Sequence, residues 1–278
     1  MKAASKGLFV FHPHGRVSEE VLDEDFANHK EMAWSHSLHK REIELSDDAR
    51  LSEETRLSDY CICASEFTAN SIRTISENKP LFVVPYGCFP PRDLSHRERP
   101  FTDVLRYLFV GQGVQRKGIH HLIKVWRRGP NRRRVLTIVG SKMDPAVLSL
   151  ASDCKDSIVF KRGLTKKELE LEYEQADIFV LPSLVEGFGL VYLEALSAGC
   201  FVIGTTNTGL PDLQVPSSVA SVIKAGDLCQ LEEALNSAAE TVRAPSFDRS
   251  LIKAFAATRS WDRFREGIRS ALRTIDAI

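Results

Sequence analysis

Glu186-Gly187-Phe188-Gly189-Leu190-Val191-Tyr192-Leu193-Glu194 places a carboxylate on each side of a Gly-Phe-Gly turn that opens a predicted helix. The segment before it, residues 177–183, has the short apolar character of a buried strand. A strand that passes through a glycine turn into a helix forms an anion site, because backbone N–H groups meet the positive end of the helix dipole there. Glu186 precedes the helix, and Glu194 lies about one and a half turns into it. The segment therefore suits a ligand with phosphate and hydroxyl groups, such as a sugar nucleotide.

The C-terminal part of the sequence alternates predicted strands with predicted helices. This strict alternation predicts an α/β fold with a Rossmann-like, doubly wound parallel sheet. Ligands bind such sheets at the carboxyl ends of the strands, so the loops after the first and fourth predicted strands share one edge. We expect strands at 105–110, 135–140, 157–160, 177–181, 200–204 and 219–223, and helices at 118–128, 145–153, 166–175, 190–198 and 228–239.

Residues 177–205, D-I-F-V-L-P-S-L-V-E-G-F-G-L-V-Y-L-E-A-L-S-A-G-C-F-V-I-G-T, resemble the group 1 glycosyltransferases (family 4) over the whole run. The two glutamates match the E-x₇-E motif of that family. The alternative is an ordinary glycine turn with Glu194 as a solvated helix residue, and the length of the matching run argues against it. The resemblance implies the GT-B fold, in which two Rossmann-like domains face each other. It also implies a retaining transfer of a hexose from a nucleoside diphosphate sugar to a hydroxyl acceptor, a glycan or a lipid-linked glycan.

The first hundred residues predict only part of the family's first domain. Strands are expected at 7–11, 59–63 and 81–85, a helix at 66–76, and a charged, interrupted helical segment at 17–57. Residues 57–262 resemble the family well and residues 1–56 weakly. We therefore expect a partial acceptor-side α/β domain and linker at 1–100, a nucleotide-sugar-binding domain at 101–260 and a terminal helix at 261–278. Three explanations stay open for the short first domain: a fragment, a partner chain that supplies the missing half, or loss of activity.

A second strand–loop–helix element, Phe109-Val110-Gly111-Gln112-Gly113-Val114-Gln115-Arg116-Lys117-Gly118, follows the first strand of the C-terminal part. A glycine loop followed by an arginine and a lysine suits a diphosphate, because lysine supplies a point charge and arginine a fork of donors. The element resembles the family's phosphate loop, and Lys117 matches the lysine that stabilises the leaving diphosphate. Gln112 stands where many members have arginine, and Arg116, which is adjacent to Lys117, is expected to compensate. The alternative, a solvated basic helix start, would oppose the helix dipole.

The resemblance assigns roles to the residues of a donor site. Glu186 would face the sugar, Glu194 the ribose hydroxyls, and the loop from Arg162 to Leu164 the base. The only small molecule expected is the nucleotide sugar, whose base the sequence does not reveal. No metal is expected, because Lys117 and Arg116 would supply the positive charge. The expected catalytic residues are Glu186, Lys117 and Arg116, and the expected donor-binding residues are Gly111, Gly113, Arg162, Leu164, Gly187, Phe188, Gly189, Leu190 and Glu194.

Two groups of histidines follow predicted elements of the site. His12-Pro13-His14-Gly15 follows the first predicted strand, and either His12 or His14 could be the acceptor-side histidine that family members often place after a strand. Histidine suits proton handling near neutral pH, and a surface loop is the alternative. His120 and His121 follow the phosphate loop, and the sequence assigns them no role.

Composition narrows the functional classes. The 37 basic and 37 acidic residues balance, so no nucleic-acid partner is expected. The six cysteines show no paired metal-ligand spacing and fit a reducing cytoplasm. No apolar run is long enough to span a bilayer. A basic group at 127–134 leaves peripheral membrane contact open, with a solvated loop as the alternative. Two other functions remain: a donor-binding module or inactive subunit that needs a partner chain, and a sugar-nucleotide epimerase or hydrolase.

Overall fold

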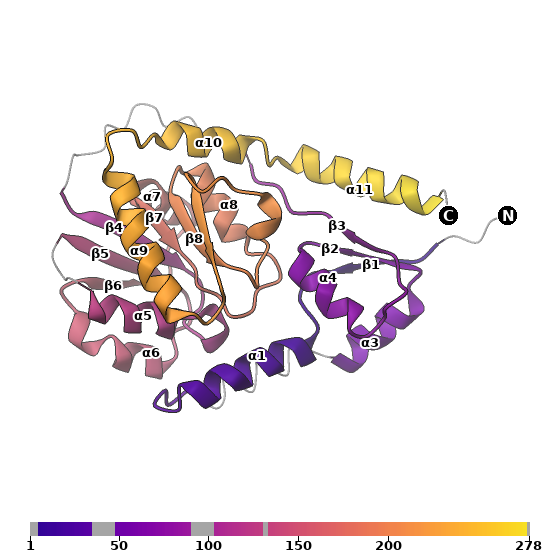
Figure 1. Cartoon of the computed structure of the whole chain (residues 1–278), viewed down its shortest axis with the longest axis horizontal. Coiled ribbons are helices and arrows are strands. Elements are labelled where there is room, and N and C mark those ends of the chain that lie inside the picture. The colour runs from indigo at the N-terminus through magenta and orange to yellow at the C-terminus, as the bar shows by residue number, and fades with distance from the viewer. Residues whose placement is uncertain (1–4, 35–47, 90–102, 130–132, 277–278) are drawn as a thin grey trace.

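The computed structural model describes residues 5–34, 48–89, 103–129 and 133–276. The middle of the charged segment expected at 17–57 and the linker expected to end at residue 100 lie largely outside these ranges. Within them, the strands form two parallel sheets, of three and six strands. Figure 1 shows the larger sheet with its helices at one end of the molecule and the smaller sheet at the other.

The six-stranded sheet confirms the predicted doubly wound arrangement. Its order is β6-β5-β4-β7-β8-β9, and every neighbouring pair is parallel. The central strands β7 and β8 are buried at every position, which explains why their sequences are continuous apolar runs. The strands are β4 (Leu105–Val110), β5 (Arg134–Val139), β6 (Ile158–Lys161), β7 (Ile178–Val180), β8 (Phe201–Thr205) and β9 (Ala220–Ile223).

Helices connect these strands, and some begin at a side chain that caps their first turn. Thr165 and Glu168 form a capping box at the start of α7, and Asp227 caps α9. Within the described residues, no helix combines the length and the apolar character needed to cross a membrane. The helices of this part are α5 (Ile119–Arg128), α6 (Pro145–Leu150), α7 (Lys166–Gln175), α8 (Leu190–Ser197), α9 (Leu228–Arg243), α10 (Arg249–Ala257) and α11 (Trp261–Asp276).

Helix α10 was not expected from the sequence. It packs against α8, and its first residue, Arg249, donates hydrogen bonds to the carbonyl oxygens of Ala176 and Ala198. These carbonyls lie at the C-terminal ends of α7 and α8, where backbone acceptors need partners from outside the helix. The guanidinium supplies them from about 50 or more residues away in the chain. A tertiary contact of this kind produces no local sequence pattern from which the helix could be predicted.

The smaller sheet has the order β1-β2-β3. It buries Cys61 and Cys63 on one face against Ile72 of α4, as strand alternation predicts. The helix expected at 66–76 ends early, at Arg73. The elements are β1 (Gly7–Val10), α1 (Gly15–Asn28), α3 (Asp48–Leu57), β2 (Tyr60–Cys63), α4 (Glu66–Arg73) and β3 (Leu81–Val83).

Two helices connect the sheets in opposite directions. Helix α1 leaves the small sheet and runs beneath α5 of the larger part, while α11 runs from the larger part over the small sheet (Figure 1). Along α1, Gln115 donates a hydrogen bond to the carbonyl oxygen of Leu22. Along α11, the ring of Phe264 lies 6.3 Å from that of Phe9. The two parts are therefore held by helices exchanged between them as well as by direct contact.

Gly118 fixes how closely the loop after β4 approaches the loop after β7. Its φ is +63°, and a Cβ at this position would overlap the carbonyl oxygen of Pro182. Gly163 has nearly the same φ, +65°, but a Cβ there would meet no atom within 4 Å. A comparison of Gly118 with Gly163 therefore distinguishes the cost of a left-handed backbone from the cost of a steric clash between the two loops.

We predict that Gly163→Ala lowers the free energy of unfolding by about 1–2 kcal/mol, the cost of a left-handed residue with a Cβ. Gly118→Ala should lower it by about 2–5 kcal/mol, because the Cβ also forces the two loops apart. Denaturant titration of both variants measures the difference. Equal losses would show that the loops do not need this close contact.

Candidate active site

The candidate site lies at the switch point of the six-stranded sheet. Strands β4 and β7 are neighbours, and the chain winds outward from them in opposite directions. The loops that follow these two strands therefore meet at the carboxyl edge, where doubly wound sheets bind ligands. The N–H groups of Leu184 and Val185 donate to the carbonyl oxygen of Arg116 at 2.8 and 3.2 Å. The backbone thus connects the two predicted donor-binding loops directly.

Glu186, Lys117 and Arg116 form an ion cluster where the loops meet. Lys117 Nζ donates to Glu186 Oε2, and Arg116 Nη1 lies 3.6 Å from the same oxygen. The Glu186 side chain is only 11% exposed, and that of Lys117 12%. Burial alone would raise the pKa of Glu186, but the two cations hold it below its ordinary value. The cluster keeps an ionised carboxylate beside two cations, and it brings together the three residues expected to be catalytic.

The Gly187–Gly189 turn brings the chain from Glu186 into α8. Gly189 has a φ of +87° and no side chain caps the first turn of the helix. Phe188 is buried, packs on Gly209 and lies 5.0 Å from the ring of Tyr86. Its side chain therefore holds the turn in place, and only its backbone can face a ligand.

Glu194 accepts a hydrogen bond from the hydroxyl of Tyr173 at 2.8 Å. Both side chains line a pocket of about 580 Å³, together with Leu190 at the start of α8. Burial raises the pKa of Tyr173 well above its ordinary value, so the hydroxyl stays a donor. Tyr173 was not singled out in the sequence, because its contact with Glu194 joins two different helices. Its hydroxyl orients the carboxylate expected to bind ribose.

The remaining donor-site residues lie at two loops. Gly111 and Gly113 follow β4, and Gly113 pairs with Met143 on the adjacent loop. Arg162 and Leu164 follow β6, with Arg162 exposed and Leu164 half-buried. Neither Arg162 nor Leu164 lines the pocket beside Glu194. The structure thus brings the ion cluster together and leaves the predicted base loop apart from that pocket.

The two candidate histidines have different environments. His14 is 4% exposed, caps α1, and its Nε2 lies 3.1 Å from Ser52 Oγ. His12 is exposed, and its charge contributes to the lowered pKa of Glu186. The backbone at His12 also lies against Gly187, where a Cβ would overlap the carbonyl oxygen of Phe11. The backbone at His12 therefore lies beside the Gly187 turn, while His14 is held by its contacts with α1 and Ser52.

The small sheet also contributes to the site through residues that the sequence indicated only as a helix start. Ser65 Oγ and Thr68 Oγ1 donate to the carbonyl oxygen of Gly187 at 2.5 and 3.1 Å. Asp212, in turn, accepts from the N–H of Glu66 at 3.1 Å. These contacts join positions more than a hundred residues apart, so spacing in the sequence could not reveal them.

Comparison with known proteins establishes the class. The family model for glycosyl transferases group 1 matches residues 92–246, which is more than half of the chain. The chain belongs to the group 1 glycosyltransferase family. Its likeness to solved structures shows the GT-B fold. Sucrose-phosphate synthase from Thermosynechococcus elongatus aligns with a TM-score of 0.74 at 20% identity, over 98% of this chain and 68% of that one. WaaG, a glycosyltransferase of lipopolysaccharide biosynthesis, aligns with a TM-score of 0.66 at 19% identity, over 96% and 74%.

Curated relatives include two mannosyltransferases. The GDP-mannose-dependent monoacylated alpha-(1-6)-phosphatidylinositol monomannoside mannosyltransferase of Corynebacterium glutamicum is 33% identical over 192 residues, or 62% of this chain and 50% of that protein. The MMP alpha-(1->4)-mannosyltransferase of Mycolicibacterium hassiacum is 26% identical over 185 residues, or 63% and 44%. The chain thus spans about half the length of these relatives.

We predict that the ion cluster makes stability depend on pH through Glu186. Its folded-state pKa lies below the unfolded value, so its contribution is complete above about pH 4.5 and is lost as the pH falls through the folded-state value. The stability difference between wild type and Glu186→Gln should therefore be largest near pH 7 and shrink towards about pH 4. Denaturant titrations over this range measure it, with exposed Glu233→Gln on α9 as the control. A difference that does not change with pH would contradict the cluster.

Proposed function

We propose that this chain carries the donor site of a retaining glycosyltransferase that moves a hexose from a nucleoside diphosphate sugar to a hydroxyl acceptor. The observation that carries the proposal is the buried contact of Lys117 and Arg116 with Glu186 at the start of α8. Family membership and the GT-B fold support the same activity. The relatives' names suggest GDP-mannose as the first donor to test, and a lipid-linked glycan as one class of acceptor.

The proposed mechanism uses cations that are already in position. Departure of a nucleoside diphosphate builds negative charge, and positive groups fixed beforehand stabilise it without reorganisation. Lys117 and Arg116 would provide that charge, and the backbone at the start of α8 would add its dipole. Glu186 keeps both cations at the turn and would accept hydrogen bonds from the sugar hydroxyls. On this proposal, turnover needs no added magnesium or manganese, because the two side chains take the place of the metal.

The nucleoside end of the donor is proposed to bind beside Glu194. Its carboxylate, oriented by Tyr173, is suited to accept two hydrogen bonds from a ribose diol. On the other side of the turn, His12 is proposed to face the acceptor hydroxyl, since it is the exposed histidine close to Glu186.

Thermal unfolding with GDP, UDP or ADP, and with their sugar conjugates, tests the donor site. A ligand that binds the folded chain at about a hundred times its dissociation constant should raise the midpoint by several degrees. We expect one nucleotide to do so, with GDP the first candidate. Glu194→Ala should weaken that nucleotide by about tenfold or more, because a charged acceptor is lost, while exposed Glu233→Ala leaves it unchanged. Normal binding by Glu194→Ala would remove the ribose role.

Lys117 and Arg116 should contribute differently to the affinity for the nucleoside diphosphate. Lys117 donates to Glu186 and is less exposed than Arg116, so its charge is the less screened by water. We predict that Lys117→Ala weakens nucleoside diphosphate binding more than Arg116→Ala does. Isothermal titration calorimetry with the diphosphate measures both. The reverse order would assign the diphosphate to Arg116 instead.

The three-stranded sheet favours a second candidate function, a donor-binding subunit that works with another polypeptide. Such a subunit would bind the nucleotide without turnover, and a partner chain would restore activity. Release of free sugar from the donor without any acceptor would instead indicate a hydrolase on the same fold. Product analysis by mass spectrometry, with and without acceptor, separates these outcomes from transfer.

A further inference from the structure

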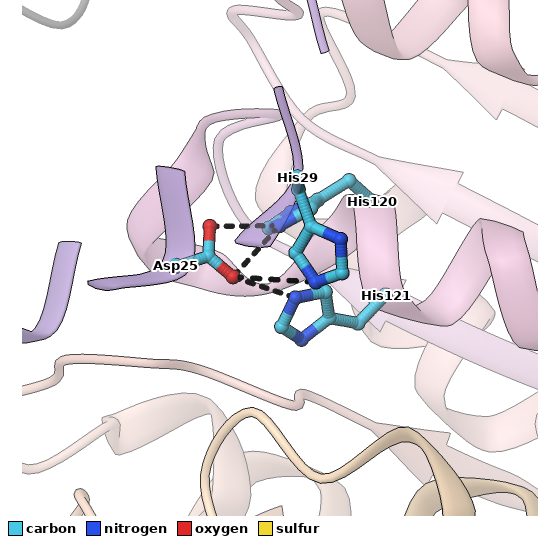
Figure 2. Close-up of side chains that lie close together, drawn as sticks. All are labelled: Asp25, His29, His120 and His121. Atoms are coloured by element: carbon cyan, nitrogen blue, oxygen red, sulfur yellow. Dashed lines mark hydrogen bonds and ion pairs between the residues drawn. The ribbon is translucent and has the colours of Figure 1, made fainter. Parts of the chain in front are cut away.

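Three histidines converge on one carboxylate between α1 and α5. Asp25 lies in the last turn of α1 and His29 directly follows that helix, and His120 and His121 are adjacent on α5 (Figure 2). Asp25 Oδ2 lies 3.0 Å from His120 Nε2, and Asp25 Oδ1 lies 2.7 Å from His121 Nε2 and 3.8 Å from His29 Nε2. One ligand atom from each of the four residues can be chosen so that all lie within 4.8 Å of one another.

These distances fit a tetrahedral ion with little movement. Zinc binds histidine nitrogen and carboxylate oxygen at about 2.0–2.2 Å, so the ligand atoms of a tetrahedral site lie roughly 3.4 Å apart. The observed separations of Asp25 from the three rings lie on both sides of that value. Three imidazoles and one carboxylate favour zinc over magnesium or calcium, which prefer oxygen ligands throughout.

The cluster is buried, and the protein does not provide a well-aligned hydrogen bond for every polar atom in it. The side chains of Asp25, His120 and His121 are at most 4% exposed. His121 Nε2 is buried and points into the cluster, yet makes no hydrogen bond of acceptable geometry. Buried polar atoms of this kind are rare and usually have a reason. A cation at the centre would satisfy this nitrogen and the carboxylate together.

We propose that Asp25, His29, His120 and His121 form a structural zinc site that fastens α1 to α5. The sequence contains its signal as an aspartate and a histidine four residues apart on one helix, with a histidine pair on another. The donor-site expectation of no metal concerns different residues and is unaffected.

Neighbouring groups support the site in the way that metal ligands are usually supported. Gln115 Nε2 donates to Asp25 Oδ2 at 2.8 Å, which orients the carboxylate. His29 Nδ1 lies 2.9 Å from Lys124 Nζ, which also donates to Glu31 Oε1, so these contacts position the His29 ring beside the cluster. Zinc on His29 Nε2 would require Nδ1 to carry the proton and Lys124 to turn to Glu31 alone.

The position of the site gives it a consequence for the phosphate loop. Gln115 directly precedes Arg116 and Lys117, and its amide also donates to the carbonyl oxygen of Leu22 on α1. An ion that fixes α1 against α5 would therefore also fix Gln115, the residue directly before the Arg-Lys pair. The zinc would hold the two parts of the molecule in register without touching the donor.

The test measures zinc directly and does not depend on activity. The full chain, without a histidine tag and with exposed Cys229 replaced by serine, is equilibrated with zinc, passed through gel filtration and analysed by mass spectrometry for metal. We expect about one zinc per chain. Asp25→Asn and His121→Gln should each lose it, whereas Asp23→Asn, at an exposed position on the same helix, should keep it. Zinc should raise the thermal midpoint of the wild type and of Asp23→Asn only.

The visible spectrum of bound cobalt provides a second test, which needs no substituted protein. Cobalt(II) alone, added to the metal-free chain, should give the intense visible bands of a tetrahedral site, and zinc should abolish them. Absence of retained zinc, an octahedral cobalt spectrum, or undiminished zinc in a folded Asp25→Asn variant would each overturn the proposal. Far-ultraviolet circular dichroism shows whether a variant is folded. If a variant does not fold, the cobalt spectrum of the unmutated chain tests the proposal instead.

Discussion

The buried contact between Glu186 and the cations of Arg116 and Lys117 is the interaction on which the site depends. It joins two loops that are about seventy residues apart in the chain but leave neighbouring strands of one sheet. A carboxylate removed from water at this place is stable only while paired, so the loops must stay together for the charge to be accommodated. The same constraint keeps two cations at the carboxyl edge, ready for a phosphate group.

The small sheet is attached to these same loops. Ser65 and Thr68 donate to the carbonyl oxygen of Gly187, on one side of the ion cluster, and Gln115 reaches α1 on the other. Both contacts use buried polar groups, which are costly to separate without other partners. The position of the small sheet is therefore coupled to the geometry of the Gly187–Gly189 turn, and a displacement of one changes the contacts of the other.

Much of the larger sheet could be predicted because its signals are local. β4 and α7 have the expected bounds, and the other strands differ by one or two residues. The capping box at Thr165 and the apolar runs of β7 and β8 depend only on neighbours in the chain. Helix α10 was missed, because Arg249 is held by carbonyls of α7 and α8 rather than by its own sequence.

By itself the sequence determined the fold class, the family and the two loops that meet at the candidate site, because periodicity and glycine turns act over a few residues. Only the tertiary structure decided that the backbone at His12 lies beside Gly187 while His14 caps a helix. It alone brought Tyr173 to Glu194, and Asp25 to the histidines of α5. Each of these depends on distance in space between elements far apart in the chain, which spacing along one sequence does not encode.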